Sequence, residues 1–309
     1  MTRHFLSLHD FTAAEIDGLL RLSAAVKKDP AKYRSALAGK SLAMIFQKSS
    51  TRTRVSFEVG MFQLGGHALF LSSRDIQIGR GETVSDTAQV LSRYVEGIMA
   101  RTFAHQDVLD LARFGAVPVV NGLTDDLHPC QALCDYFTLR EIFGDLRGRK
   151  IAYVGDGNNM AHSLMFGASK VGMDIAVASP AGYDVKAKYF DLALADAAAA
   201  GTQVNLHRDP REAVAGASAV YTDVWASMGQ EEEAEARRQA FVGFCVDAKL
   251  MALARQDAVF LHCLPCHRGE EVAAEVVDGR QSRVFDEAEN RLHAQKAILL
   301  WAMGGVDIV

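Results

Sequence analysis

The sequence predicts an α/β protein made of two doubly wound parallel-sheet domains. Three observations support this fold class. The chain has 309 residues, about twice what one domain of about 150 residues requires. Short apolar runs alternate with longer amphipathic segments throughout, which is typical of βαβ units and parallel sheets. A polar, glycine-containing break, GDLRGRK, lies at residues 144–150 and directly precedes a new apolar run.

We place the domain boundary at this break. The prediction is a first domain over residues 1–145 and a second over 146–285, followed by a C-terminal helix within 286–309 that returns to the first domain. In parallel sheets, ligands bind beyond the carboxyl ends of the strands. Candidate site residues are therefore sought directly after the apolar runs.

The expected strands are the short apolar runs. They begin at Ser41, His67, Gly97, Ala116, Lys150, Met173, Ser218 and Ala258. Helical spacing of apolar residues predicts helices over 56–64, 84–94 and 132–143, an alanine-rich helix over 192–200, and a last amphipathic helix over about 286–303.

Composition and charge limit the classes of function. Thirty-three basic and 38 acidic residues leave a formal net charge of −5, so the chain has no bulk attraction for nucleic acid or for an anionic membrane. Five cysteines, an odd count in a long chain, favour free thiols in a reducing compartment. We find no signal-peptide pattern and no apolar run near the roughly 20 residues that span a bilayer. We therefore expect a cytoplasmic protein that binds any anion through a local cluster.

Such a cluster is predicted in the first half of the chain. Ser50, Thr51, Arg52 and Thr53 lie in KSSTRTRVSFE, between an expected strand and an expected helix. Hydroxyls at a helix start, the free N–H groups of its first turn and fork-shaped guanidinium groups all suit phosphate. Arg101 ends the expected strand GIMAR, where it would point into a site.

LHPCQAL adds groups that suit a carbonyl or an amide. His128 and Gln131 lie near a helix start, and Pro129 occupies a position that tolerates proline. A neutral histidine can donate one hydrogen bond to a carbonyl oxygen, and glutamine can bridge to an amide.

The second half offers residues that suit an amino acid. GDGNNMAHS follows a strand, but Met160 stands where a dinucleotide fingerprint needs its third glycine. Asn158 and Asn159 supply amide groups instead. Asp223 ends a strand and is followed by a loop with Ser227 and Met228, and its carboxylate could hold a substrate ammonium group.

The segment HCLPCHRGEEV allows a different interpretation. Cys263 and Cys266 form C-x-x-C after a strand, which is typical of a redox dithiol, and with His262 and His267 they could bind zinc. Too little chain follows for a thioredoxin-type module. A zinc site would need a second ligand pair, for which the candidates are His128, Cys130 and Cys134.

The motifs taken together resemble the carbamoyltransferase family. STRTR, the MARTFAH region, HPCQ, GDGNN, DVWASMG, HCLPCHRG and FDEAENRLHAQKA occur in this order over nearly the whole chain. STRTR and HPxQ mark the wider family, and SMG together with HCLP marks its ornithine branch. One departure is Cys266, where the family more often has alanine.

The resemblance implies a homotrimer whose active site lies in the cleft between the two domains. Carbamoyl phosphate would bind the first domain and ornithine the second, with no metal or organic cofactor. Arg101, His128, Asp223 and Cys263 would be catalytic. Carbamoyl phosphate would contact Ser50, Thr51, Arg52, Thr53, Gln77 (across a subunit interface), Arg101, His128, Pro129, Cys130, Gln131, Cys263, Leu264 and Arg291. Ornithine would contact Asn159, Asp223, Ser227 and Met228.

The implied reaction is attack of the ornithine side-chain amine on the carbamoyl carbon, giving citrulline and phosphate. Such an enzyme takes part in arginine biosynthesis or breakdown, and one site serves both directions. Two alternatives remain open. One is a carbamoyltransferase for another amine, such as putrescine. The other is a zinc or dithiol module built around Cys263 and Cys266.

Overall fold

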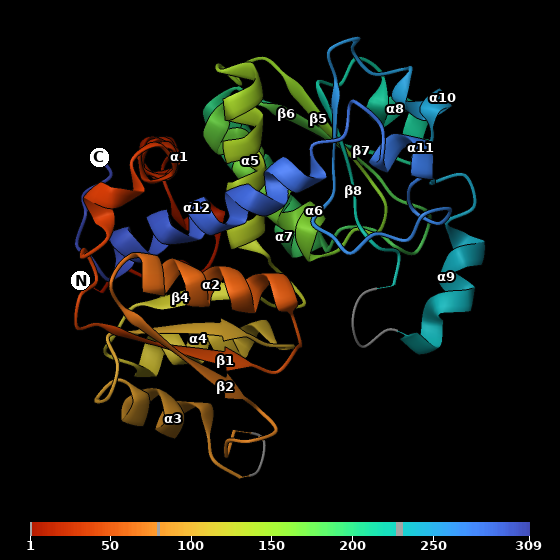
Figure 1. The fold of residues 1–309 in the computed structure, drawn as a ribbon. Coiled ribbons are helices and arrows are strands. Elements are labelled where there is room, and N and C mark those ends of the chain that lie inside the picture. Colours follow the sequence, from red (N-terminus) through yellow and green to blue (C-terminus); the bar gives the residue numbers. More distant parts are fainter. Residues whose placement is uncertain (1, 79–80, 227–230) are drawn as a thin grey trace. The chain divides into compact units, whose positions relative to one another are not determined.

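The computed structural model describes residues 2–78, 81–226 and 231–309. The chain divides into two compact units, one formed by Met1–Phe137 with Asn290–Val309 and the other by Thr138–Glu289. One sheet has four strands in the order β2-β1-β3-β4, and the other has five in the order β7-β6-β5-β8-β9. Every pairing between these strands is parallel. The predicted fold class of two parallel-sheet α/β units is confirmed (Figure 1).

The first α-helix of this unit carries a capping box, in which Thr12 accepts from the backbone of Glu15 and the Glu15 carboxylate accepts from Thr12. In Figure 1, α2 covers one face of the sheet and α3 the other. The elements are η1 (Leu8–Asp10), α1 (Ala13–Lys28), η2 (Pro30–Tyr33), β1 (Ser41–Phe46), α2 (Thr51–Gln63), β2 (His67–Ser72), α3 (Val84–Leu91), β3 (Gly97–Arg101), α4 (His105–Phe114) and β4 (Val119–Leu123). The division between the units falls inside α5 (Pro129–Phe143) and α12 (Val284–Ala302).

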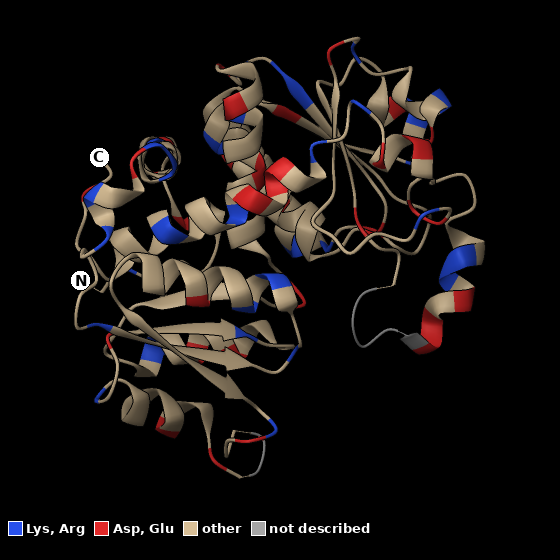
Figure 2. Ribbon diagram, viewed as in Figure 1, with Lys and Arg blue, Asp and Glu red and all other residues tan. Residues whose placement is uncertain are grey.

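The second unit repeats the strand–helix alternation. Its elements are β5 (Lys150–Val154), α6 (Asn159–Val171), β6 (Asp174–Ala178), α7 (Ala187–Ala200), β7 (Val204–His207), α8 (Pro210–Val214), β8 (Ala219–Thr222), η3 (Glu231–Glu233), α9 (Ala234–Ala240), α10 (Ala248–Met251), β9 (Val259–Leu261) and α11 (Ala274–Val277). Strands of both sheets carry almost no charge, and charged positions lie on helices and loops (Figure 2). Buried parallel strands require such apolar runs.

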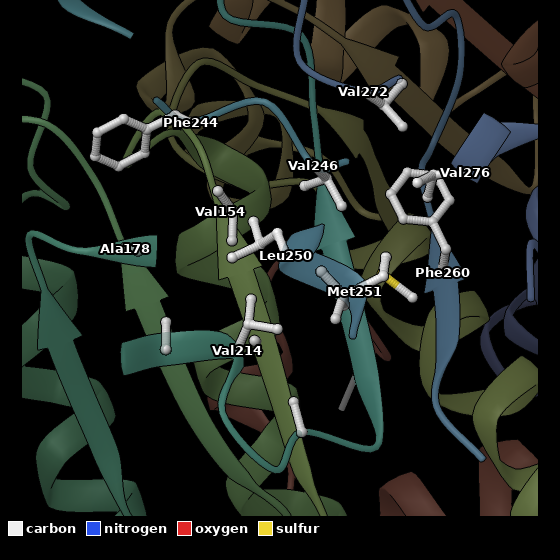
Figure 3. Packing of buried hydrophobic residues seen from close by; sticks show 14 of the residues in the cluster. Val154, Ala178, Val214, Phe244, Val246, Leu250, Met251, Phe260, Val272 and Val276 are labelled. Carbon is white, nitrogen blue, oxygen red and sulfur yellow. The ribbon is translucent and has the colours of Figure 1, made fainter. Parts of the chain in front are cut away.

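The core of the second unit fills one face of its sheet. Figure 3 shows Val154 of β5 among Val214, Leu250 and Met251, with Phe260 of β9 beside Val276. Small side chains such as that of Ala178 project little from the sheet, so that the short helices α8 and α10 can pack against it. This packing holds the carboxyl ends of β5 and β8, where the sequence places its polar residues.

The observed elements match the predicted ones closely, with differences that have physical causes. β4 begins at Val119 rather than Ala116, because Pro118 has no N–H to donate to a ladder. α2 begins at Thr51, before the predicted start at Ser56, because polar capping residues conceal the amphipathic pattern of its first turn. β7 was not predicted. It is a four-residue strand with two exposed positions at the sheet edge. No helix in the described residues is long and apolar enough to span a membrane.

Candidate active site

The residues between β1 and α2 place groups that can bind an anion at the start of α2. Ser50 is the N-cap, and its hydroxyl accepts a hydrogen bond from the Thr53 amide at 3.2 Å. The first-turn amides of an α-helix point out of its N-terminus, and the helix dipole adds partial positive charge there. Thr51 is exposed, Arg52 is half-buried and Thr53 is buried. The predicted hydroxyl and guanidinium groups therefore lie at one helix terminus.

Four cationic side chains surround His128, which is 5 % exposed. Burial lowers the pKa of His128 well below its ordinary value, and the charges of Arg291, Arg101, Lys48 and Arg52 lower this pKa further. The imidazole is therefore neutral and can act as donor at one nitrogen only. The structure thus brings together residues that are far apart in sequence: Lys48 after β1, Arg52 in α2, Arg101 at the end of β3, His128 before α5 and Arg291 in α12.

A buried chain of hydrogen bonds joins Arg291 to two of the predicted residues. Its Nη1 donates to the side-chain oxygen of Gln131, and its Nη2 donates to the Thr53 hydroxyl at 3.2 Å. Gln131 in turn donates from Nε2 to Asp135 at 2.7 Å. The sequence identified Arg291, but it did not reveal these partners.

Pro129 and Cys130 form the start of α5, and both are buried. The Cys130 thiol donates to the carbonyl of Asn121 at 3.3 Å, and burial raises the pKa of this thiol to about 12. Cys130 is therefore neutral and turned to the backbone, so any contact with an anion would come from its amide.

Gln77 and Arg54 are not among the residues whose charges act on His128. Gln77 is exposed after β2, and within the described residues it makes no hydrogen bond to the groups around His128. Arg54 lies 3.7 Å from the ring centroid of Phe70 and donates to Glu58 at 3.1 Å. It lines a cavity of about 550 Å³ together with Ser50 and Thr51. The Arg54 side chain is therefore engaged by Phe70 and Glu58 beside a cavity that Ser50 and Thr51 also line.

In the second unit, Asp223 directly follows β8 and is almost fully buried. Its Oδ1 accepts from the Cys263 thiol at 3.1 Å and from the Val224 amide at 2.9 Å. Its Oδ2 accepts from Nδ2 of Asn158 at 3.1 Å. Asp223 and Cys263, predicted from separate motifs, are therefore in direct contact.

The Cys263 loop is held by buried acidic residues. His262 accepts from the Leu264 amide at Nδ1, 2.9 Å away, so the ring proton lies on Nε2, which faces Glu271 at 3.3 Å. The His262 amide donates to Glu287 at 3.0 Å. Leu264 adopts a φ of 57°, in the left-handed region. Local strain of this kind persists only where the surroundings fix the backbone.

Two groups of side chains in the described ranges have a spacing that could hold a metal ion. They are Asp223 with His262 and Cys263, and His267 with Glu270 and Glu271. Neither group contains Cys266. The Cys266 thiol is half-buried, and burial raises its pKa. The geometry therefore does not assemble the ligand set that the zinc interpretation of C-x-x-C requires.

The remaining ornithine residues are only partly described. Asn159 is half-buried at the first position of α6. Ser227 and Met228 lie outside the described residues. Sequence reasoning missed the direct contact of Asn158 with Asp223, and it missed Tyr153, which donates to Asn158 at 3.1 Å. The only available signal was the position of both residues near the carboxyl end of β5.

The comparisons with known proteins cover both units. Residues 3–141 match the carbamoyl-P binding domain of aspartate/ornithine carbamoyltransferase, and residues 147–302 match its Asp/Orn binding domain. An ornithine carbamoyltransferase of Anoxybacillus flavithermus is 57 % identical over 300 residues, covering 96 % of each chain. An anabolic ornithine carbamoyltransferase of Pyrococcus furiosus is 55 % identical over 306 residues, covering 98 % of this chain and 96 % of the relative.

The fold agrees with these sequence matches. A solved ornithine carbamoyltransferase from Pyrococcus furiosus is similar with a TM-score of 0.95 and 54 % identity, covering 99 % of this chain and 98 % of that one. Both domain models match in order, and the solved relative covers nearly the whole chain. The chain therefore belongs to the aspartate/ornithine carbamoyltransferase family.

Proposed function

We propose that this protein transfers the carbamoyl group of carbamoyl phosphate to the side-chain amine of L-ornithine, giving L-citrulline and phosphate. The names of its full-length relatives support ornithine as the acceptor. The observation that carries the proposal is the set of four cations around a neutral, buried His128, in the unit that matches the carbamoyl-P binding domain. A dianionic acyl phosphate needs such a site, and the net-negative chain supplies it locally.

Carbamoyl phosphate is assigned to the first unit. The phosphate is held by Ser50, Thr51, Arg52 and Thr53 together with Arg101. His128 and Gln131 hold the carbamoyl group, and Arg291 completes the set. Pro129 and Cys130 contribute through the backbone at the start of α5. Cys263 and Leu264 are assigned to the reacting centre as well. Support comes from the helix terminus at Ser50 and from the Arg291–Gln131–Thr53 hydrogen bonds.

Ornithine is assigned to the second unit, with Asp223 as the group that attracts its side-chain ammonium. Asn159, Ser227 and Met228 complete this half of the assignment. Asp223 and Cys263 are in contact at 3.1 Å, so both can lie beside the same amine. Either group can position the amine or take its proton.

The chemistry follows from these roles. The free amine of ornithine attacks the carbamoyl carbon and forms a tetrahedral intermediate with a negative oxygen. Arg101, His128 and the Thr53 hydroxyl stabilise that oxygen, because donors fixed in a buried site need no reorganisation. The C–O bond to phosphate then breaks, the bond electrons leave with the phosphate, and the amine proton is lost. Arg52 and the helix terminus neutralise the departing phosphate.

We further propose a cytoplasmic homotrimer that acts in arginine biosynthesis. The biosynthetic direction rests on the word anabolic in the name of the Pyrococcus furiosus relative. Gln77, exposed after β2, is assigned to carbamoyl phosphate on a neighbouring subunit. A trimer is tested by the mass of the purified protein in solution.

The decisive experiment measures citrulline formed from carbamoyl phosphate and ornithine, with putrescine offered in parallel. We expect a kcat/KM for ornithine at least about 100-fold above that for putrescine, since putrescine lacks the α-amino and carboxylate groups. If kcat/KM for putrescine equals or exceeds that for ornithine, ornithine is not the preferred acceptor and this part of the proposal is wrong. No carbamoyl transfer to either amine would overturn the proposed function.

A further inference from the structure

Gln295 contacts Arg291 from one turn further along α12, and it is fully buried. With its amide oxygen facing the guanidinium group, Gln295 accepts from Nε of Arg291 at 3.2 Å and from Nη2 at 3.1 Å. Its amide nitrogen then donates to the Ser56 hydroxyl on α2. Two nitrogens of one guanidinium group thus share a single acceptor.

The hydrogen bonds of the neighbours fix this orientation of the amide. The Ser56 hydroxyl donates to the carbonyl of Arg52 at 2.7 Å, so its oxygen can only accept from Gln295. Gln131 is fixed in the same way, because its Nε2 donates to Asp135 and its oxygen must therefore accept from Arg291. The guanidinium group is consequently held on several edges at once.

We propose that Gln295 is a positioning residue that fixes the plane of the Arg291 guanidinium group for carbamoyl phosphate, with Ser56 fixing Gln295. The proposal rests on the function proposed above, because that function assigns Arg291 to this substrate. An arginine side chain has several rotatable bonds, and ordering it at the moment of binding would weaken affinity. A buried, neutral acceptor orders the side chain beforehand and leaves its positive charge intact.

The neighbouring residue Lys296 provides a matched control. It lies on the same helix and is equally buried, but its ammonium group donates to Gln63 at 2.9 Å and not to a residue of the proposed site. Replacement of either side chain by methionine removes a buried polar group at similar volume. The two changes differ in whether Arg291 loses a partner.

The experiment compares Gln295→Met, Ser56→Ala and Lys296→Met with the parent protein. We expect Gln295→Met to raise KM for carbamoyl phosphate by about tenfold, the effect of about one charge-assisted hydrogen bond, with KM for ornithine within about twofold. Ser56→Ala should raise the same KM by about threefold, since it removes only the fixation of Gln295. Lys296→Met should leave both KM values unchanged, although it alters the melting temperature.

A second measurement does not depend on activity. Calorimetric titration with inorganic phosphate should show the Kd weakened by about tenfold in Gln295→Met and unchanged in Lys296→Met. The inference is overturned if Gln295→Met binds phosphate as the parent does, or if both KM values rise together in proportion to lost stability. If Gln295→Met does not fold, Ser56→Ala decides by the same criteria. A parent that binds phosphate but makes no citrulline overturns the proposed function, and the calorimetric comparison still decides the role of Gln295.

Discussion

Replacing Asp223 by asparagine tests the acceptor half of the proposed site most directly. The change keeps the size of the side chain and exchanges one carboxylate oxygen for an NH₂ group. In the structure both oxygens accept hydrogen bonds, from Cys263, Val224 and Asn158. Whichever way the new amide turns, its NH₂ group faces at least one other donor. The substitution therefore removes the charge and also disturbs the local network.

The magnitude follows from the interactions that are lost. A hydrogen bond to a charged group contributes about 1.5–3 kcal/mol, and about 1.4 kcal/mol corresponds to a factor of ten. We therefore expect KM for ornithine to rise by about 10- to 150-fold. The opposed donors should also lower the free energy of unfolding by about 1–3 kcal/mol. KM for carbamoyl phosphate should change less than KM for ornithine, because most of the residues assigned to carbamoyl phosphate lie in the first unit.

The assay is the initial rate of citrulline formation as ornithine is varied, repeated from pH 6 to pH 9. An alkylamine like that of lysine has a pKa of about 10.4, so the free amine increases about tenfold per pH unit in this range. The parent kcat/KM for ornithine should therefore rise from pH 6 through about pH 8. The loss of kcat/KM for ornithine in Asp223→Asn, relative to the parent, should be largest at pH 6. It should become smaller as the pH rises, because the free amine needs no ion pair.

The matched control is Asp209→Asn at the exposed N-cap of α8, where Asp209 accepts from the Arg211 amide. It makes the same chemical change outside the site and should leave both KM values unaltered. A parent profile that is flat between pH 6 and 8, or an Asp223→Asn protein with the parental KM for ornithine, would refute the reasoning.

Three further predictions follow from the geometry. Arg52→Lys should weaken kcat/KM for carbamoyl phosphate by at least about 2 kcal/mol, because one ammonium group cannot replace a fork of donors; near-parental kinetics with this substrate would remove Arg52 from the phosphate site. Cys266→Ala should retain activity whereas Cys263→Ala should lose most of it, as measured by citrulline formation; equal losses, or stoichiometric zinc in the purified protein, would favour the metal interpretation. The lowered pKa of His128 means that the unfolded chain binds a proton below about pH 6.5 while the folded chain does not. Stability should therefore fall as the pH drops through this range, by up to about 1.4 kcal/mol per pH unit, and urea unfolding of His128→Asn should show a smaller fall.

Much of the fold could be predicted because its strands are buried on both faces. Runs such as SLAMIF and KIAYV contain almost no charge, and their bounds in the structure begin at the predicted residues Ser41 and Lys150. β7 was missed for the opposite physical reason. VNLH lies at the edge of its sheet, where Asn205 and Leu206 stay exposed, so no apolar run marks it. The start of α2 was placed late because its capping residues are polar.

Some residues of the candidate site could likewise be predicted from the sequence, and others could not. Residues in the loops after strands, such as Ser50 and Asp223, could be identified because ligands in parallel sheets bind at the strand ends. The hydrogen-bond partners that hold site residues in place could not be identified from the sequence. Gln131 and Arg291 are 160 residues apart in sequence, and Thr53 and Arg291 are 238 residues apart. Local periodicity carries no information about contacts at such separations.

The sequence by itself determined the class of fold, the strand ends that carry chemistry and the family to which these motifs belong, because each depends on local pattern. Only the tertiary structure decided that His128 is neutral, that Cys130 faces the backbone and that Arg291 is held by Gln131 and Gln295. Protonation states and hydrogen-bond partners depend on burial and on charges a few ångströms away. Those surroundings exist only after segments distant in the chain have packed together.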